Sequence, residues 1–310
     1  MSDRAPFLFG GNMRYIHFTE GEREQARLTD IAAFLQQCGE EVKRSGSENM
    51  WLDHGQKVTI RGNLWFHQYE QVGGDAIDFA CRFYHMDYPE AVQLMLSMGV
   101  GIIQGAVEPF PQKELVLPPK HENMRRVYGY LLRRRGIDKD VLDAFVYRGL
   151  VYESSDYHNT VFVGMDKAGK PRHIHKHSTA AQGGFKGNEA GSEPEYSFHW
   201  HGGGGVLYFF EAPIDMLSFI SLYKHCWKSQ SYGAACGVSD RALWQMLKDG
   251  PHIQKVYLCL DNDEAGHKAA RRIAAQLTEK GIPNELLVPD RKDWNEELLH
   301  YRKGEAQSKA

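Results

Sequence analysis

The hydrophobic pattern of the last hundred residues alternates between two kinds of segment. Short, nearly continuous apolar runs are typical of buried strands, and they cover residues 206–210, 230–234, 255–260 and 283–288. The segments between them carry apolar residues at helical spacing, over residues 213–223, 240–247 and 265–280. Strands that alternate with helices in this way form a parallel sheet with helices on its faces. The pattern therefore predicts an α/β fold with functional residues at the carboxyl ends of the strands.

The first hundred residues show a different pattern. Residues 1–22 are glycine-rich and aromatic without a clear period, so we interpret them as an irregular N-terminal arm. Residues 23–98 form a compact module in which short strand-like runs lie between helical segments. The helices are predicted at 29–38, 75–83 and 88–96, and a hairpin at 57–66.

A stretch rich in proline and glycine, residues 99–120, separates this module from the rest and is predicted to be a linker. Beyond it, residues 121–205 combine helical and strand-like segments, at 123–136, 138–145, 160–164 and 171–175. The parallel sheet then occupies residues 206–295, and residues 296–310 follow as a C-terminal tail. The fold class is therefore α/β in the sheet domain and α+β overall.

Length and composition agree with a folded protein of more than one domain. The chain has 310 residues, more than a single hydrophobic core usually organises. Its composition, with 42% hydrophobic and 25% charged residues, excludes the disordered and fibrous classes of protein. The formal charge of −3 means that nucleic-acid binding would need a local basic patch. Five widely spaced cysteines indicate reduced thiols, and no signal peptide or membrane-spanning run occurs. We therefore expect a cytoplasmic protein with no membrane contact.

Acidic residues follow two of the predicted strands. Glu211 comes directly after the run at 206–210, and Asp261 and Asp263 follow the run at 255–260. Residues i and i+2 of an extended segment point the same way, so both aspartates are expected to reach one crevice beside Glu211. Carboxylate oxygens are the ligands that Mg²⁺ prefers. The alternative is helix capping, since Asp263 precedes a helical segment.

These residues resemble the Toprim domain that DnaG-type primases, topoisomerases and some nucleases share. Glu211 matches the glutamate after the first Toprim strand, and residues 261–266, Asp-Asn-Asp-Glu-Ala-Gly, match the D-x-D-x-A-G motif. Residues 288–296 look like the closing acidic stretch of primases, with Asp293 at its first acidic position and Asn295 replacing the second, which weakens one ligand position. The resemblance implies a Toprim-type parallel sheet with Mg²⁺ or Mn²⁺ as cofactor. The implied metal ligands are Glu211, Asp261, Asp263 and Asp293, of which the first three are catalytic.

The resemblance to primases continues upstream. Residues 130–137, Tyr-Leu-Leu-Arg-Arg-Arg-Gly-Ile, together with 141–150 look like the Y-L-x-x-R-G-I and F-x-x-G segments that begin a primase catalytic domain. Residues 191–198 are similar to the stretch before the Toprim strand in primase-like proteins of plasmids and conjugative elements. Residues 121–205 are therefore interpreted as a primase-type basic subdomain.

Residues 23–98 resemble the zinc ribbon of primases without its ligands. The ribbon's C-x-x-H and C-x-x-C positions fall on Trp51 and His54, then on His67 and Glu70, just before the glycines at 73–74. No thiolate remains, and structural zinc normally has four Cys or His ligands. We therefore interpret this part as a degenerate zinc-ribbon-like module held by apolar residues, and we do not expect it to bind zinc. The alternative is a weak site with three ligands, His54, His67 and Glu70.

Basic residues gather at two places in the primase-like subdomain. One is the end of a predicted helix at 133–135, where cations also complement the helix dipole, and the other spans residues 170–186. Contacts to phosphates hold nucleic acid without reading its sequence. The resemblance assigns template and nucleotide binding to Arg172, Lys176 and Lys186, and we expect Arg133 and Arg135 to contribute. The alternative for both groups is a charged, solvated surface.

The resemblance implies a DNA primase-like nucleotidyltransferase that makes short primers on single-stranded DNA for the replication or transfer of a mobile element. In that reaction a 3′-hydroxyl attacks an α-phosphate, and a divalent metal offsets charge on the attacking and leaving oxygens. The expected ligands are single-stranded DNA and nucleoside triphosphates, with a helicase or another replication protein as a candidate partner. Two alternatives stay open: a Toprim metal-dependent nuclease, and a non-catalytic accessory protein that binds single-stranded DNA.

Overall fold

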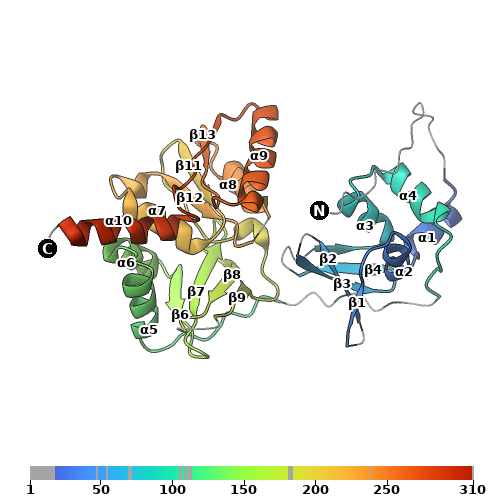
Figure 1. Cartoon of the computed structure of the whole chain (residues 1–310), viewed down its shortest axis with the longest axis horizontal. Helices are drawn as coiled ribbons and strands as arrows, with labels where there is room; N and C mark the ends of the chain where they lie inside the picture. The colour runs from blue at the N-terminus through green and yellow to red at the C-terminus, as the bar shows by residue number, and fades with distance from the viewer. Residues whose placement is uncertain are drawn as a thin grey trace. The chain divides into compact units, whose positions relative to one another are not determined.

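The computed structural model describes residues 18–46, 48–53, 55–68, 72–104, 107, 110, 114–180, 184–237 and 239–308. The chain divides into two compact units (Figure 1). The first comprises Met1–Gln68 and Val72–Phe110, and the second comprises Tyr69–Gln71 and Pro111–Ala310. None of the helices in the described ranges is long and apolar enough to cross a membrane.

The first unit is an antiparallel sheet with helices packed on it. Its five strands are neighbours in chain order: β1 (Lys43–Ser45), β2 (Glu48–Asp53), β3 (Gln56–Arg61), β4 (Leu64–His67) and β5 (Val72–Gly74). Its helices are α1 (Glu20–Arg27), α2 (Ile31–Gln37), α3 (Ala76–Phe83) and α4 (Tyr88–Ser97). Capping boxes begin three of them, at Thr19, Asp75 and Asp87, because each side chain accepts a hydrogen bond from a first-turn N–H group. The predicted irregular arm therefore ends inside helix α1, while residues 1–17 lie outside the described part.

Aromatic side chains fill the core of the first unit around the positions that correspond to zinc ligands. Trp51 is 1% exposed, and its ring centroid lies 5.3 Å from that of Phe79 and 5.2 Å from that of Phe83. His67 is also 1% exposed and stacks on Phe83, with 6.4 Å between ring centroids. Buried aromatic rings are large contributors to core stability, at about 1.5–3 kcal/mol for burying one such side chain. The other two predicted positions, His54 and Glu70, lie outside the described residues, so the expected lack of zinc stays a prediction.

The second unit begins with a four-stranded antiparallel sheet. Its strands are again neighbours in chain order: β6 (Val151–Glu153), β7 (Thr160–Met165), β8 (Pro171–His177) and β9 (Lys186–Asn188). Before it come α5 (Arg125–Tyr128), the π-helical turn η1 (Gly129–Arg134) and α6 (Lys139–Tyr147). The single helix predicted at 123–136 is thus a short α-helical turn that widens into a π-helical one. Strand β9 is not among the strands predicted from the sequence. Its three residues are placed by pairing with β8, a tertiary contact that no local pattern indicates.

A second sheet, mostly parallel, forms the rest of this unit. Its strand order is β10-β12-β11-β13-β14, with β10 antiparallel at one edge and the other four parallel. The strands are β10 (His199–Trp200), β11 (Val206–Phe210), β12 (Ser231–Ala234), β13 (Lys255–Leu258) and β14 (Asn284–Leu286). The longer helices are α7 (Pro213–Leu222), α8 (Arg241–Asp249), α9 (Glu264–Glu279) and α10 (Trp294–Ser308), and the short 3₁₀ turns are η2 (Pro194–Tyr196) and η3 (Trp227–Ser229). The predicted α/β class with a parallel sheet is confirmed (Figure 1).

Apolar clusters cover both faces of the parallel sheet. Phe210 belongs to the cluster that contains residues of α7 and α10, whereas Phe209 belongs to the cluster that contains residues of α8 and α9. Successive side chains of a strand point to opposite faces, so these neighbours enter different cores. Because both faces are buried, polar residues of the sheet can meet only at its edges and at the ends of its strands.

Helix α10 is the largest difference from the sequence interpretation. The predicted C-terminal tail, residues 296–310, contains most of this helix. Helix α10 packs against α7, and its Trp294 and Leu298 are 3% and 1% exposed. These two apolar residues stand one helical turn apart, which is too short a pattern to identify a helix from sequence.

Candidate active site

The ends of strands β11 and β13 bring the first acidic residues together. The two strands are parallel neighbours, with Phe209 paired to Leu258, and the N–H of Cys259 donates to the carbonyl oxygen of Phe209 at 2.8 Å. Glu211 and Asp261 therefore leave the sheet at the same edge, as the sequence predicts for the carboxyl ends of parallel strands.

Two further predicted carboxylates lie at the N-termini of helices. Asp263 caps α9, where its Oδ1 accepts from the N–H of Gly266 at 2.8 Å. Asp293 precedes α10, and its Oδ1 accepts from the N–H of Glu296 at 2.7 Å. Helix capping, the simpler interpretation of Asp263, is thus present in the structure. It engages one oxygen of each carboxylate and is compatible with a cation at the other.

Electrostatics show that these carboxylates form one cluster. Burial and the charges of Glu211, Asp293 and Asp263 raise the pKa of Asp261 to about 7. Burial and the charge of Asp263 also raise the pKa of Glu211. Within the described residues, Oδ1 of Asp261 is buried and has no hydrogen-bond partner. A buried carboxylate oxygen without a donor is unfavourable by itself, and a bound cation would satisfy it.

A fifth carboxylate, Asp215, was not predicted from the sequence. It lies in the first turn of α7, is 7% exposed, and accepts a hydrogen bond from the N–H of Asn295 at 3.2 Å. Burial and the charges of Asp261 and Asp293 raise its pKa well above the ordinary value. An aspartate in an otherwise apolar helix, four residues after Glu211, is the signal that could have identified it.

Two lysines face the acidic cluster. Lys186 of strand β9 and Lys292 before α10 are both exposed, and their charges lower the pKa of Glu211 against the effect of burial. Lys186 acts in the same direction on Asp261. The antiparallel sheet thus supplies a cation to the end of the parallel sheet. Of the predicted nucleic-acid residues, Lys186 is the one that the structure brings to the carboxylates.

Asn295 has a structural position. It is 3% exposed, and its Nδ2 donates to the carbonyl oxygen of Arg135 at 2.7 Å and to Oγ of Ser218 at 3.0 Å. Its Oδ1 accepts from the guanidinium of Arg135 at 3.0 Å. The side-chain amide is therefore used to join the start of α10 to the end of η1 and to α7. The expected weakening of a metal-ligand position at residue 295 stays a prediction.

The other predicted cations differ in their surroundings. Arg172 makes two hydrogen bonds of 2.7 Å to Glu193 and one of 3.1 Å to Asp166, and the ammonium of Lys176 lies 2.6 Å from Glu189. Arg135 donates from Nε to the hydroxyl of Tyr130 at 2.8 Å as well as to Asn295, whereas Arg133 is exposed. Because carboxylates already pair with Arg172 and Lys176, these two side chains are less available to bind phosphates than Lys186 is.

Gly266 allows helix α9 to start directly beside Asp261. A Cβ atom at this position would lie 2.1 Å from the carbonyl oxygen of Asp261, a separation that atoms do not adopt. The glycine of the D-x-D-x-A-G motif is therefore needed for this close approach, which keeps the acidic loop against the helix N-terminus.

Comparison with known families defines the class of this domain. Residues 208–298 match the model of a family described as Toprim-like, and residues 129–204 match a family described as a protein of unknown function, DUF3991. The Toprim-like match covers Glu211, Asp215, Asp261, Asp263 and Asp293. The sequence-based resemblance to the Toprim domain is thus confirmed.

The individual proteins that this chain resembles have low sequence identity to it. The chain is 25% identical to an uncharacterized protein of Bacillus anthracis, pXO2-78, over 94% of this chain and 92% of that protein. Among solved structures, it is similar to the primase fragment of the bacteriophage T7 primase-helicase protein, with 21% identity, a TM-score of 0.44, and coverage of 56% of this chain and 71% of that one. It is also similar to the Aquifex aeolicus primase, with 15% identity, a TM-score of 0.39, and coverage of 94% and 85%.

The raised pKa of Asp261 predicts how pH affects stability. Its pKa is about 7 in the folded protein against 3.8 ordinarily, so the folded state holds this proton more tightly than the unfolded state. Metal-free protein should therefore lose stability as pH rises from about 4 to about 7 and then level off. Mg²⁺ should raise the melting temperature more above pH 7 than below it, because the cation binds the ionised cluster. Thermal unfolding with and without Mg²⁺ across this range measures both effects, and a Mg²⁺ effect independent of pH would contradict the prediction.

Proposed function

We propose that the protein is a divalent-metal-dependent nucleotidyltransferase of the primase type, which joins nucleotides into short primers on single-stranded DNA. The observation that carries the proposal is the convergence of five carboxylates at one end of the parallel sheet, where Oδ1 of Asp261 is buried and has no hydrogen-bond partner in the described part of the chain. The Toprim-like family match to the same residues supports it, as does the primase-like sequence at 130–150.

The donor set fits magnesium or manganese. Every candidate ligand is a carboxylate oxygen, which is the donor that hard divalent cations prefer, and the cluster carries enough negative charge to attract one. The residues that would hold the cation are Glu211, Asp261, Asp263 and Asp293. When bound, such a cation offsets negative charge on the attacking and leaving oxygens of phosphoryl transfer.

The remaining chemistry falls to the chain's own side chains. Glu211 would serve either as a ligand of the cation or as the general base. Burial and the charge of Asp263 raise its pKa, which suits a carboxylate that accepts the proton of an attacking 3′-hydroxyl. Lys186 and Lys292 stand beside this carboxylate and would attract the phosphates of the incoming nucleotide. Arg133 and Arg135 at the end of η1 are proposed to extend the cationic surface toward the template.

Salt dependence of single-strand binding tests the proposed phosphate contacts. Lys186→Ala should reduce the slope of log K against log salt by about 0.7, the value for one phosphate contact on single-stranded nucleic acid. Arg172→Ala is the matched control, because Glu193 and Asp166 already engage its guanidinium, and its slope should stay as in the wild type. Fluorescence anisotropy with unrelated oligonucleotides measures both. The reverse result, a flatter slope only for Arg172→Ala, would place the contact at strand β8.

Primer synthesis is tested directly with single-stranded templates, labelled nucleoside triphosphates and Mg²⁺ or Mn²⁺, with products separated by length. New oligomers that require both template and metal are expected. Shortened template without new oligomers would identify a Toprim nuclease that uses the same carboxylates. Binding of single strands with neither product would indicate an accessory protein, and would overturn the proposal.

A further inference from the structure

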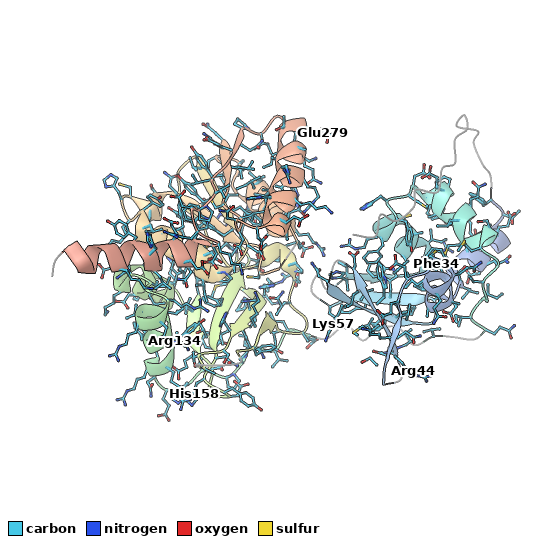
Figure 2. The ribbon with its side chains drawn as sticks, in the orientation of Figure 1. Phe34, Arg44, Lys57, Arg134, His158 and Glu279 are labelled. Atoms are coloured by element: carbon cyan, nitrogen blue, oxygen red, sulfur yellow. The ribbon has the colours of Figure 1, made fainter. Side chains whose placement is uncertain are left out.

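A second group of metal-ligating side chains shares no residue with the carboxylate cluster. His121, Glu153 and His158 each offer a ligand atom, and these atoms all lie within 4.8 Å of one another. Figure 2 labels His158 at the end of the second unit that is farthest in the view from Glu279, the last residue of helix α9. Within the described ranges, no other group of His, Cys, Asp and Glu side chains is as compact by this measure.

Backbone pairing places His121 beside Glu153. The N–H of His121 donates to the carbonyl oxygen of Glu153 at 2.8 Å, and Lys120 forms an isolated antiparallel bridge with Ser154. The segment before α5 thus runs along the end of strand β6 like a short extra strand. Two residues that are 32 positions apart in the chain become direct neighbours through this pairing.

Glu153 is a buried carboxylate with one oxygen fixed by the backbone. Its residue is 1% exposed, and Oε2 accepts hydrogen bonds from the N–H groups of Arg126 and Val127 at 3.0 and 3.2 Å. Its Oε1 lies 2.7 Å from Nδ1 of His158. A buried carboxylate needs hydrogen-bond or charged partners, and those of Glu153 are two backbone N–H groups and the imidazole of His158.

A strained turn holds His158 over this carboxylate. Tyr157 and His158 have backbone φ angles of 55° and 50°, which residues other than glycine rarely adopt. The turn is fastened by Ser154, whose Oγ donates to the carbonyl oxygen of Asp156 at 2.6 Å, and by Thr179, whose Oγ1 donates to that of His158 at 2.9 Å. Strain of this kind persists where the surroundings impose it and is common at ligand-binding positions.

The two imidazole rings are arranged as a pair. Their centroids lie 4.6 Å apart at an interplanar angle of 56°. Nδ1 of His121 lies 3.0 Å from the carbonyl oxygen of Asn123 and 3.1 Å from the backbone nitrogen of the same residue. The tautomer whose Nδ1 donates to that carbonyl oxygen leaves the lone pair of Nε2 for a cation. Both histidines are half-buried. Ligands in a tetrahedral zinc site lie roughly 3.3 Å apart, so binding would require the three side chains to draw closer together.

From this geometry we propose that His121, Glu153 and His158 bind one divalent transition-metal cation of the zinc class. Two imidazole nitrogens with one carboxylate favour zinc over magnesium, which prefers oxygen ligands throughout. His158 also lines a cavity of about 570 Å³, so the fourth coordination position is open to water or an anion. The cation would join the segment before α5 to the β6–β7 turn. The proposal concerns the second unit only and is separate from the zinc-ribbon-like module.

Isothermal titration of chelator-stripped, full-length protein with zinc chloride tests the proposal. The titration is made in millimolar Mg²⁺, which keeps the carboxylate cluster occupied. One zinc per chain is expected for the wild type, and His121→Gln and His158→Gln should each weaken binding by about a hundredfold or more. With Co²⁺ in place of zinc, a visible d–d absorption should appear in the wild type and be lost in the same two variants.

Two control variants locate the zinc. His300→Gln, at an exposed histidine of the same unit, and His67→Gln in the first unit should both bind zinc as the wild type does. The proposal is overturned if the wild type binds no zinc under these conditions, if the double variant His121→Gln/His158→Gln binds it unchanged, or if His67→Gln alone removes it. Because binding and absorption are measured rather than activity, these outcomes do not depend on the proposed primer synthesis.

Discussion

Asp261→Asn is expected to lower nucleotide incorporation by at least about a thousandfold, since a lost metal ligand removes several kcal/mol of transition-state stabilisation. Burial and three neighbouring negative charges raise the pKa of Asp261, and its Oδ1 has no hydrogen-bond partner among the described residues. Asparagine keeps the shape of the side chain but offers one oxygen and no charge. Primer extension under saturating nucleotide measures the effect.

The same substitution is expected to stabilise the metal-free protein. Above pH 7 the ionised Asp261 is held close to Glu211, Asp263 and Asp293, and a neutral amide removes that repulsion. After allowance for solvent screening, we expect the free energy of unfolding to rise by about 1–2 kcal/mol. Urea unfolding in the presence of a chelator measures it, and the stabilisation should vanish below about pH 3, where the carboxylate is protonated in both states.

Opposite changes in activity and stability are what distinguish a metal site from a structural one. Asp290→Asn is the matched control, because Asp290 is exposed and lies three residues before Asp293; neither quantity should change in it. If Asp261→Asn retained full turnover, the carboxylate cluster would not be the catalytic site. If it lost activity together with stability, the loss would be one of folding.

Asn295→Asp is expected to destabilise the protein by about 3 kcal/mol and to lower the melting temperature by about 6–12 °C. The carboxylate would replace an amide that donates to the carbonyl oxygen of Arg135 and to Ser218 in a position that is 3% exposed. It would also place a second buried carboxylate beside Asp215, which already accepts from the N–H of residue 295. The attraction to the guanidinium of Arg135 offsets only part of this.

Asn284→Asp provides the comparison, because Asn284 is half-buried and its amide donates to Thr278 and to the carbonyl oxygen of Ile282 near the surface. Its effect should stay below about 1 kcal/mol. A different result for Asn295→Asp would change the interpretation: unchanged stability with tighter Mg²⁺ binding would show that position 295 is a metal-ligand position after all.

Local patterns in the sequence determined the elements and the main acidic residues. The strands at 206–210 and 255–260 are short apolar runs between helices, and such runs can be buried only in a sheet covered on both faces. Glu211, Asp261 and Asp263 follow from this directly, because the carboxyl ends of parallel strands share one edge. The glycine at 266 also follows, since its motif requires close approach of helix and loop.

Tertiary contacts decided what each polar side chain does. Arg172 and Lys176 look like phosphate ligands in the sequence, but strand pairing and the loop at 189–193 bring Glu193 and Glu189 to them. Asn295 looks like an altered metal ligand, and the packing of α10 on α7 turns it toward Arg135 and Ser218. The partners of these residues are distant in the chain, so no periodicity or spacing reveals them.

The same reason explains the residues that the sequence did not identify. Asp215 becomes part of the acidic cluster because helix α7 starts directly behind the sheet edge. His121, Glu153 and His158 meet because a bridge and a strained turn bring separate segments side by side. Hydrophobic periodicity is a local property and determined the class of fold and its acidic edge, whereas the neighbours of a polar group depend on long-range packing, which only the tertiary structure decided.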